Sequence, residues 1–213
     1  MIPLNVGPVP PVLAGNEEPW GIEYEEAVNA GKKPLHRYRS DQVRDALRLE
    51  TSGKCAYCES YIEHVSYSHV EHIKPKAKFP RLVCMWNNLT LACQKCNTNK
   101  GDYYEDDARL LNPYLDDVEE QVVFFGPMAI DFSDRAKLTI NRISLNRPEL
   151  LYKRSEKLSS VKLLIDLMGR AGDNVALTEA LKLDLEEALA PNAEFCSCSR
   201  YFHRSIEDHG EWN

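Results

Sequence analysis

The chain has 213 residues, 43% of them apolar and 28% charged, and a formal net charge of −7 at pH 7. This composition is typical of a globular protein and excludes a disordered one, since disordered chains carry too few apolar residues to form a core. No apolar run is long enough to span a bilayer, and residues 1–15 lack the basic start of a signal peptide, so the sequence predicts a cytoplasmic protein with no membrane contact.

The first segment, residues 1–35, is rich in proline and then in acidic residues ("NEEPWGIEYEEA"). This pattern indicates an extended arm with one short turn of helix. Trp20 and Tyr24 need a surface to pack on, which is either the rest of the chain or a partner protein.

A helix is predicted at residues 40–50, because apolar residues recur there at the helical spacing i, i+3, i+4. Ser40 is expected to cap its N-terminus, and Gly53 is expected to end it. We therefore assign residues 1–50 to an N-terminal arm and helix.

The next elements are predicted to be a strand, a loop, a strand and a helix. "HVSYSHVEHI" (residues 64–73) alternates and contains β-branched residues, and "NLTLAC" (residues 88–93) is a second strand. A short helix follows from Gln94 and stops near Gly101. These elements define a core of residues 51–112.

The remainder, residues 113–213, has a different character. "EQVVFFG" and "AIDF" predict a β-hairpin, and "KLTINRI" predicts a third strand. Residues 146–169 and 174–190 predict two helices, the first capped by Asn146 with Pro148 in its first turn. The fold class is therefore α+β, with a ββα core, an extended N-terminal arm and a mixed, mainly helical C-terminal region.

Two CxxC pairs predict a metal site. Cys55 and Cys58 form the first pair, Cys93 and Cys96 form the second, and 34 residues separate the two pairs. Each pair directs two sulfur atoms at one ion, and two pairs complete the tetrahedral four-thiolate site that is typical of structural zinc. Such a site has no open coordination position, so this Zn²⁺ is expected to stabilise the fold and not to act in catalysis.

Basic residues concentrate in the same part of the chain. Residues 71–100 contain six Lys or Arg and one acidic residue, whereas residues 101–213 have a net charge of −9. A positive segment on an acidic protein is compatible with contacts to nucleic-acid phosphates, and the alternative is a solvated loop. The candidate phosphate contacts are Lys74, Lys76, Lys78, Arg81 and Lys100.

"VEHIKPK" and "WNNLTLACQKCNTNKGD" resemble the motif of the HNH endonuclease family. The resemblance covers about residues 55–102, and it implies a ββα-metal fold that hydrolyses phosphodiester bonds. In this sequence it makes His72 the general base, and Glu71 and Asn97 the ligands of a catalytic Mg²⁺ or Mn²⁺. Asn88 would be the third catalytic residue, which holds the loop in place by hydrogen bonds.

One position departs from the family pattern, because the first acidic residue is usually Asp and here it is Glu71. The longer side chain places the ion differently, or leaves ligation to a neighbour such as His69. We expect His64 to be a surface residue and Cys84 to belong to the core.

The tail "CSCSRYFHRSIEDH" carries further metal-binding residue types. Cys196, Cys198, His203 and His209 are candidates for a second zinc site. Free thiols are the favoured interpretation, since CxC spacing is less common at zinc sites than CxxC.

A wider resemblance rests on "KCAYCES", "VEHIKPK", "LLNPYLDD" and "ISLNRPELLYKR". Together they are similar to the PtuB-type HNH nuclease subunits of Septu anti-phage systems, which are also found as retron effectors. The resemblance implies an ABC-type ATPase partner of the PtuA type, a role in phage defence and, in the retron case, a retron RNA–DNA element. DNA is the favoured substrate. The alternatives are cleavage of RNA such as tRNA, and a non-catalytic zinc module that binds nucleic acid or protein.

Overall fold

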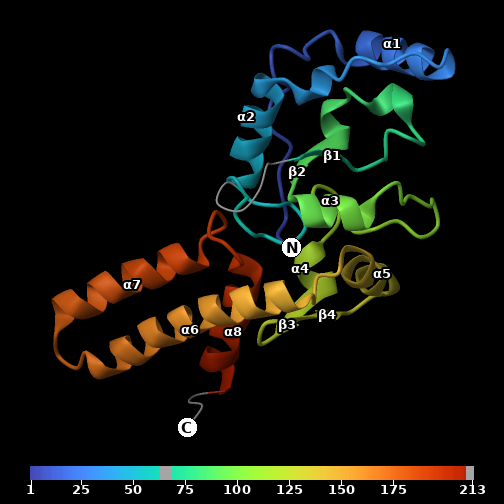
Figure 1. Ribbon diagram of the computed structural model, residues 1–213. Coiled ribbons are helices and arrows are strands. Elements are labelled where there is room, and N and C mark those ends of the chain that lie inside the picture. The colour runs from blue at the N-terminus through green and yellow to red at the C-terminus, as the bar shows by residue number, and fades with distance from the viewer. Residues whose placement is uncertain (63–68, 210–213) are drawn as a thin grey trace.

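The computed structural model describes residues 1–62 and 69–209 (Figure 1), and His64 with the first part of the predicted strand lies outside the described residues. Among the described helices, none combines the length and the apolar character that crossing a bilayer requires. In chain order the elements are α1 (Glu17–Asn29), η1 (Arg37–Arg39), α2 (Asp41–Thr51), β1 (His69–His72), η2 (Pro80–Leu82), η3 (Trp86–Asn88), β2 (Leu89–Ala92), α3 (Gln94–Lys100), α4 (Val118–Gln121), β3 (Val122–Phe125), β4 (Met128–Asp131), α5 (Asp134–Ile143), α6 (Pro148–Arg170), α7 (Val175–Leu189) and α8 (Cys196–His209), where η marks a 3-10 helix.

The predicted ββα core is present. β1 and β2 pair antiparallel, with His69 opposite Ala92 and His72 opposite Leu89, and α3 follows β2 directly. Every residue of β2 is buried, and α2 packs against this strand. Ser40 caps α2 as expected, because its side chain accepts a hydrogen bond from the backbone N–H of Val43. The molecule is α+β and mostly helical, as predicted.

The N-terminal segment is more ordered than predicted. Instead of an extended arm with one short turn, it contains the 13-residue helix α1, whose first turn carries Glu17 and Glu18. Acidic side chains at this position are stabilised by the helix dipole. α1 packs against η2, and Tyr24 is buried in the core of the same chain, so it does not present a ring to a partner.

Gly21 lies where α1 crosses the backbone of Arg81. A Cβ added at Gly21 would lie 2.1 Å from the carbonyl oxygen of Arg81. We expect Gly21→Ala to lower the free energy of unfolding by about 1–3 kcal/mol, because the helix has to move away from the loop. Urea denaturation measures this change.

Gly169 provides the matched control. It lies inside α6, and a Cβ there meets nothing within 4 Å. Gly169→Ala is expected to raise stability by up to about 1 kcal/mol through helix propensity alone. Equal stability changes in the two variants would show that the contact at Gly21 is not tight.

The C-terminal region confirms the β-hairpin and corrects the third strand. β3 and β4 pair antiparallel, but "KLTINRI" belongs to the helix α5, which Ser133 caps. Its buried residues, Ala136, Thr139, Ile140 and Ile143, recur at helical spacing. The apolar residues of "KLTINRI" fit the spacing of a strand and the spacing of a helix, and packing against α3 and β4 favours the helix.

The prediction that Asn146 caps α6 is wrong, because Arg147 occupies the N-cap position. The Asn146 amide instead exchanges two hydrogen bonds of 2.8 Å with the backbone of Ala129 in β4. This side chain therefore joins the hairpin to the start of the long helix.

α6 and α7 form an antiparallel helical pair that extends away from the core, and α8 packs against both (Figure 1). α8 was not predicted from the sequence. The outer part of the pair exposes several apolar side chains, Leu163, Leu167, Val175, Leu177 and Leu183.

Glu59 joins α8 to the core through hydrogen bonds. This residue follows Cys58, has a positive φ of 65° and is 2% exposed. Its carboxylate accepts hydrogen bonds from the backbone N–H of Ser197 (3.0 Å) and from the Ser197 hydroxyl, and it lies 2.5 Å from the amino group of Met1. Burial raises the pKa of Glu59, but the Met1 amino group and Ser197 outweigh it and hold the pKa at about 2. The carboxylate is therefore charged at neutral pH.

Candidate active site

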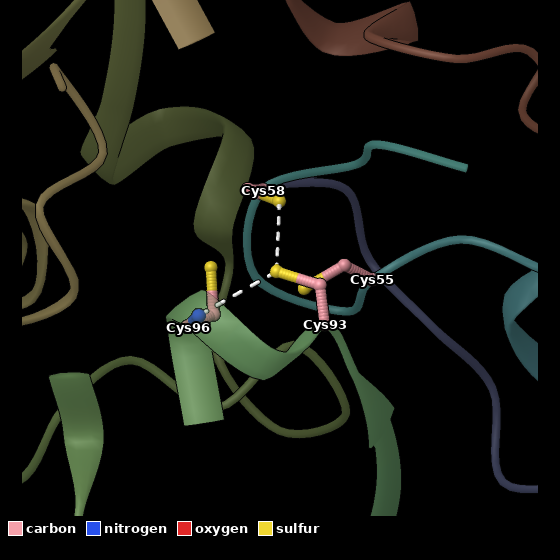
Figure 2. Close-up of side chains that lie close together, drawn as sticks. All are labelled: Cys55, Cys58, Cys93 and Cys96. Atoms are coloured by element: carbon pink, nitrogen blue, oxygen red, sulfur yellow. Dashed lines mark hydrogen bonds between the residues drawn. The ribbon is translucent and has the colours of Figure 1, made fainter. Parts of the chain in front are cut away.

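The four predicted zinc ligands lie together in the folded chain. Cys55 and Cys58 lie in the turn after α2, Cys93 caps α3, and Cys96 lies in the first turn of that helix (Figure 2). All four are buried, and their sulfur atoms lie within 4.8 Å of one another. The Sγ atoms of Cys58 and Cys93 are 3.9 Å apart. Tetrahedral zinc with Zn–S bonds of about 2.3 Å requires sulfur atoms about 3.8 Å apart, so the group fits structural Zn²⁺.

Arg147 supports this centre from the C-terminal region. Its Nη1 atom lies 3.7 Å from Sγ of Cys96, and the backbone N–H of Cys96 donates to Sγ of Cys93 (3.5 Å). Four thiolates carry more negative charge than one Zn²⁺ neutralises, so a nearby guanidinium stabilises the bound state. The CxxC spacing gave no indication of Arg147.

Glu71 and Lys100 form a buried ion pair between β1 and α3. Oε1 of Glu71 lies 2.6 Å from Nζ of Lys100, which also donates to the carbonyl oxygen of His72 (2.7 Å). Burial raises the pKa of Glu71, and Lys100 offsets only part of this effect. Lys100 is 3% exposed, so it has a partner inside the protein in place of the predicted phosphate.

His69 and Asn97 form a second pair beside the first. Nδ2 of Asn97 donates to Nδ1 of His69 at 3.2 Å. His69 and Glu71 share one face of β1, and Asn97 lies one turn before Lys100 on α3. The facing surfaces thus bring together a carboxylate, an amide and an imidazole, a donor set that suits a divalent ion such as Mg²⁺ or Mn²⁺.

His72 lies on the opposite face of β1. Its Nε2 atom is 3.0 Å from the carbonyl oxygen of Val83 and, because a carbonyl only accepts, Nε2 carries the proton and Nδ1 the lone pair. The ring of Tyr38 packs edge-on against His72, with ring centres 4.6 Å apart. Burial, together with Lys76, Lys100 and Arg39, lowers the pKa of His72 to about 3, so the ring is neutral at pH 7.

Asn88 makes the loop contacts that were expected of it. Its Oδ1 atom accepts from the backbone N–H of Lys74 (2.8 Å), and its Nδ2 atom donates to the carbonyl oxygens of Lys74 and Leu82 (both 3.1 Å). The two ends of the loop between β1 and β2 are thereby joined next to Val83, the partner of His72.

The predicted phosphate contacts differ in their surroundings. Lys74 lies over the rings of Phe79 and Tyr104, Lys78 binds the Tyr104 carbonyl and Glu105, and Arg81 pairs with Glu25. Lys76 has no hydrogen bond or ion pair among the described residues.

The described side chains of the tail do not form a second metal cluster. Sγ of Cys196 donates to Glu59, and Sγ of Cys198 donates to the carbonyl of Gly126, each at 3.3 Å, while His203 pairs with Glu207. In the part of the chain that the structure describes, only the group at Cys55 gathers three or more Cys, His, Asp or Glu side chains around one point. The side chain of His209 lies outside the described residues.

Comparisons with known proteins agree with this arrangement. Residues 55–103 match the family model described as HNH endonuclease. The chain is also 30% identical, over 165 residues, to the Septu protein PtuB of Bacillus mycoides (strain KBAB4). The alignment covers 62% of this chain and 56% of that protein, so the chain spans little more than half the length of this curated relative.

Proposed function

We propose that this protein, whose residues 55–103 form an HNH endonuclease domain, hydrolyses phosphodiester bonds in nucleic acid, with DNA as the favoured substrate. The main support is the double role of α3. Its first turn carries the zinc ligand Cys96, and its next residues present Asn97 and Lys100 to β1. The zinc centre therefore fixes the position of the helix that faces the catalytic strand.

In the proposed reaction His72 is the general base. Its neutral ring offers the Nδ1 lone pair to a water proton, while Val83 and Tyr38 fix the ring orientation. Glu71 and Asn97 would hold the Mg²⁺ or Mn²⁺ ion, with His69 as a further donor. When bound, the ion supplies stabilisation of the charge on the phosphate and on the leaving oxygen.

Cleavage assays test this proposal. The protein, purified with and without an ABC-type ATPase of the PtuA type, is incubated with plasmid, single-stranded DNA and total RNA in Mg²⁺ or Mn²⁺. We expect metal-dependent cleavage of DNA that Asn97→Ala removes. Cleavage of RNA alone would change the substrate, and no cleavage under any condition would contradict the nuclease assignment.

The similarity to the Septu protein PtuB supports a partner as well. We propose that the chain acts with an ABC-type ATPase of the PtuA type in anti-phage defence. Residues 101–213 have a net charge of −9, which does not suit binding of a polyanion and leaves these residues for contact with a protein. Within that region the exposed leucines of α6 and α7 are the candidate docking surface.

Three substitutions on this surface test the docking. We expect Leu163→Ser, Leu167→Ser and Leu183→Ser together to reduce co-purification of the ATPase at least tenfold, since buried apolar anchors each contribute about 1 kcal/mol or more. Leu49 and Leu115 provide the control, because they are 84% and 83% exposed on other parts of the surface. Loss of binding in both variants, or in neither, would remove the helical pair as the docking surface.

A further inference from the structure

A basic segment outside the matched domain lies against the catalytic face. "KKPLHRYR" (residues 32–39) contains four Lys or Arg and leads into η1. Tyr38 of this segment is 2% exposed and holds its ring against His72, 4.6 Å from centre to centre. Residues that precede the matched region by more than a dozen positions therefore form one wall of the proposed active site.

The two arginines of η1 have different surroundings. Arg37 makes two hydrogen bonds to Glu23 and lies over the ring of Trp20 at 4.8 Å, so it is part of the packing of α1. Arg39 is exposed and lies over the outer side of the Tyr38 ring at 5.5 Å. Among the described residues, no carboxylate pairs with Arg39.

The surroundings of His36 are also positively charged. Its ring packs on Tyr38, 5.7 Å from centre to centre, and its buried Nδ1 atom has no hydrogen-bond partner among the described residues. Burial lowers the pKa of His36, and Arg39, Lys76 and Lys33 lower it further. The Tyr38 ring therefore contacts Arg39 and His36 as well as His72.

We infer that Arg39, with Lys76, binds a backbone phosphate of the nucleic acid beside His72. The inference rests on the proposed function and extends it to a residue outside the HNH domain. Of the basic residues that act on His72, Lys100 pairs with Glu71, whereas Arg39 and Lys76 have no carboxylate partner among the described residues. Arg39 is held by its stacking on Tyr38. A guanidinium fixed in this way can donate two hydrogen bonds to one phosphate. Arg39 is thus a substrate-binding residue, and Tyr38 positions both it and His72.

A DNA-binding assay with a variant that cannot cleave separates phosphate binding by Arg39 from catalysis. The probe is a fluorescein-labelled DNA duplex, and the protein is the full chain carrying His72→Ala. We expect Arg39→Ala in this background to raise Kd about tenfold, as loss of a hydrogen bond to a charged group does. The slope of log K against log salt should fall by about 1, which corresponds to one phosphate contact.

Two further variants make the result specific. Arg39→Lys should restore the salt slope and part of the affinity, since it keeps the charge but not the paired hydrogen bonds. Arg44→Ala should change neither quantity, because Arg44 is a surface cation on α2 that already pairs with Asp41. Equal Kd and equal slope for Arg39→Ala and Arg44→Ala would overturn the inference, and so would a failure of the His72→Ala protein to bind the duplex. Cleavage by the wild type reports on the proposed function separately.

Discussion

The His72→Ala protein is expected to retain its fold and its zinc and to lose nucleic-acid cleavage by about 10²–10⁴-fold, the usual effect of removing a general base. The expectation follows from the neutral ring, whose Nε2 proton is committed to Val83 and whose Nδ1 lone pair remains for a water proton. No other histidine of the described chain has a ring held in this way on the face of β1 opposite Glu71.

Single-turnover cleavage measures the effect in the preparation in which the wild type is active. His203→Ala is the matched control, because His203 lies on α8 and pairs with Glu207 on the same helix. Zinc content and thermal unfolding verify that His72→Ala is folded, since His72 is 4% exposed and its removal leaves a cavity. A folded His72→Ala protein that cleaves at the wild-type rate would remove His72 from the mechanism.

Cys96→Ser and Cys55→Ser are expected to lose zinc and, with it, the fold of residues 55–102. Binding of structural zinc contributes on the order of 10 kcal/mol to folding in small zinc domains, more than most domains have as total stability. The loss should reach the proposed active site, because Cys96 and Asn97 are neighbours in α3.

Metal analysis should find at least one zinc per wild-type chain and none in these variants, and circular dichroism should show the loss of structure. Cys84→Ser is the control, since Cys84 is a buried thiol outside the four-cysteine group. An active preparation without zinc would contradict the structural role of the metal.

Local sequence patterns were sufficient to predict the parts of this fold that depend on residues close together in the sequence. The CxxC spacing identified all four cysteines of the group, and the Ser40 cap placed the start of α2. The alternation in residues 64–73 predicted the strand that includes β1, and "NLTLAC" predicted β2. Each CxxC pair, the cap and each strand are determined by residues within a few positions of one another.

Features that depend on distant contacts could not be predicted. Lys100 looked like a phosphate contact because its partner, Glu71, is far away along the chain and meets it only after β1 and α3 pack. "KLTINRI" fits a strand and a helix equally well, and only its burial against α3 and β4 decides. Arg39 and Tyr38 carry no local signal for their contact with His72.

The position of Glu59 also determines when the core is completed during synthesis. Its partner Ser197 follows it by 138 residues, and a ribosome adds about 5–20 residues per second. The turn that carries Cys55 and Cys58 therefore emerges from the ribosome on the order of ten seconds before α8, the helix that covers Glu59. During this interval the charged carboxylate next to Cys58 has the Met1 amino group as a partner but lacks its two hydrogen bonds from Ser197. A nascent chain that stops before α8 is thus left with an unfinished core, and the protein completes its fold only after most of its chain has been translated.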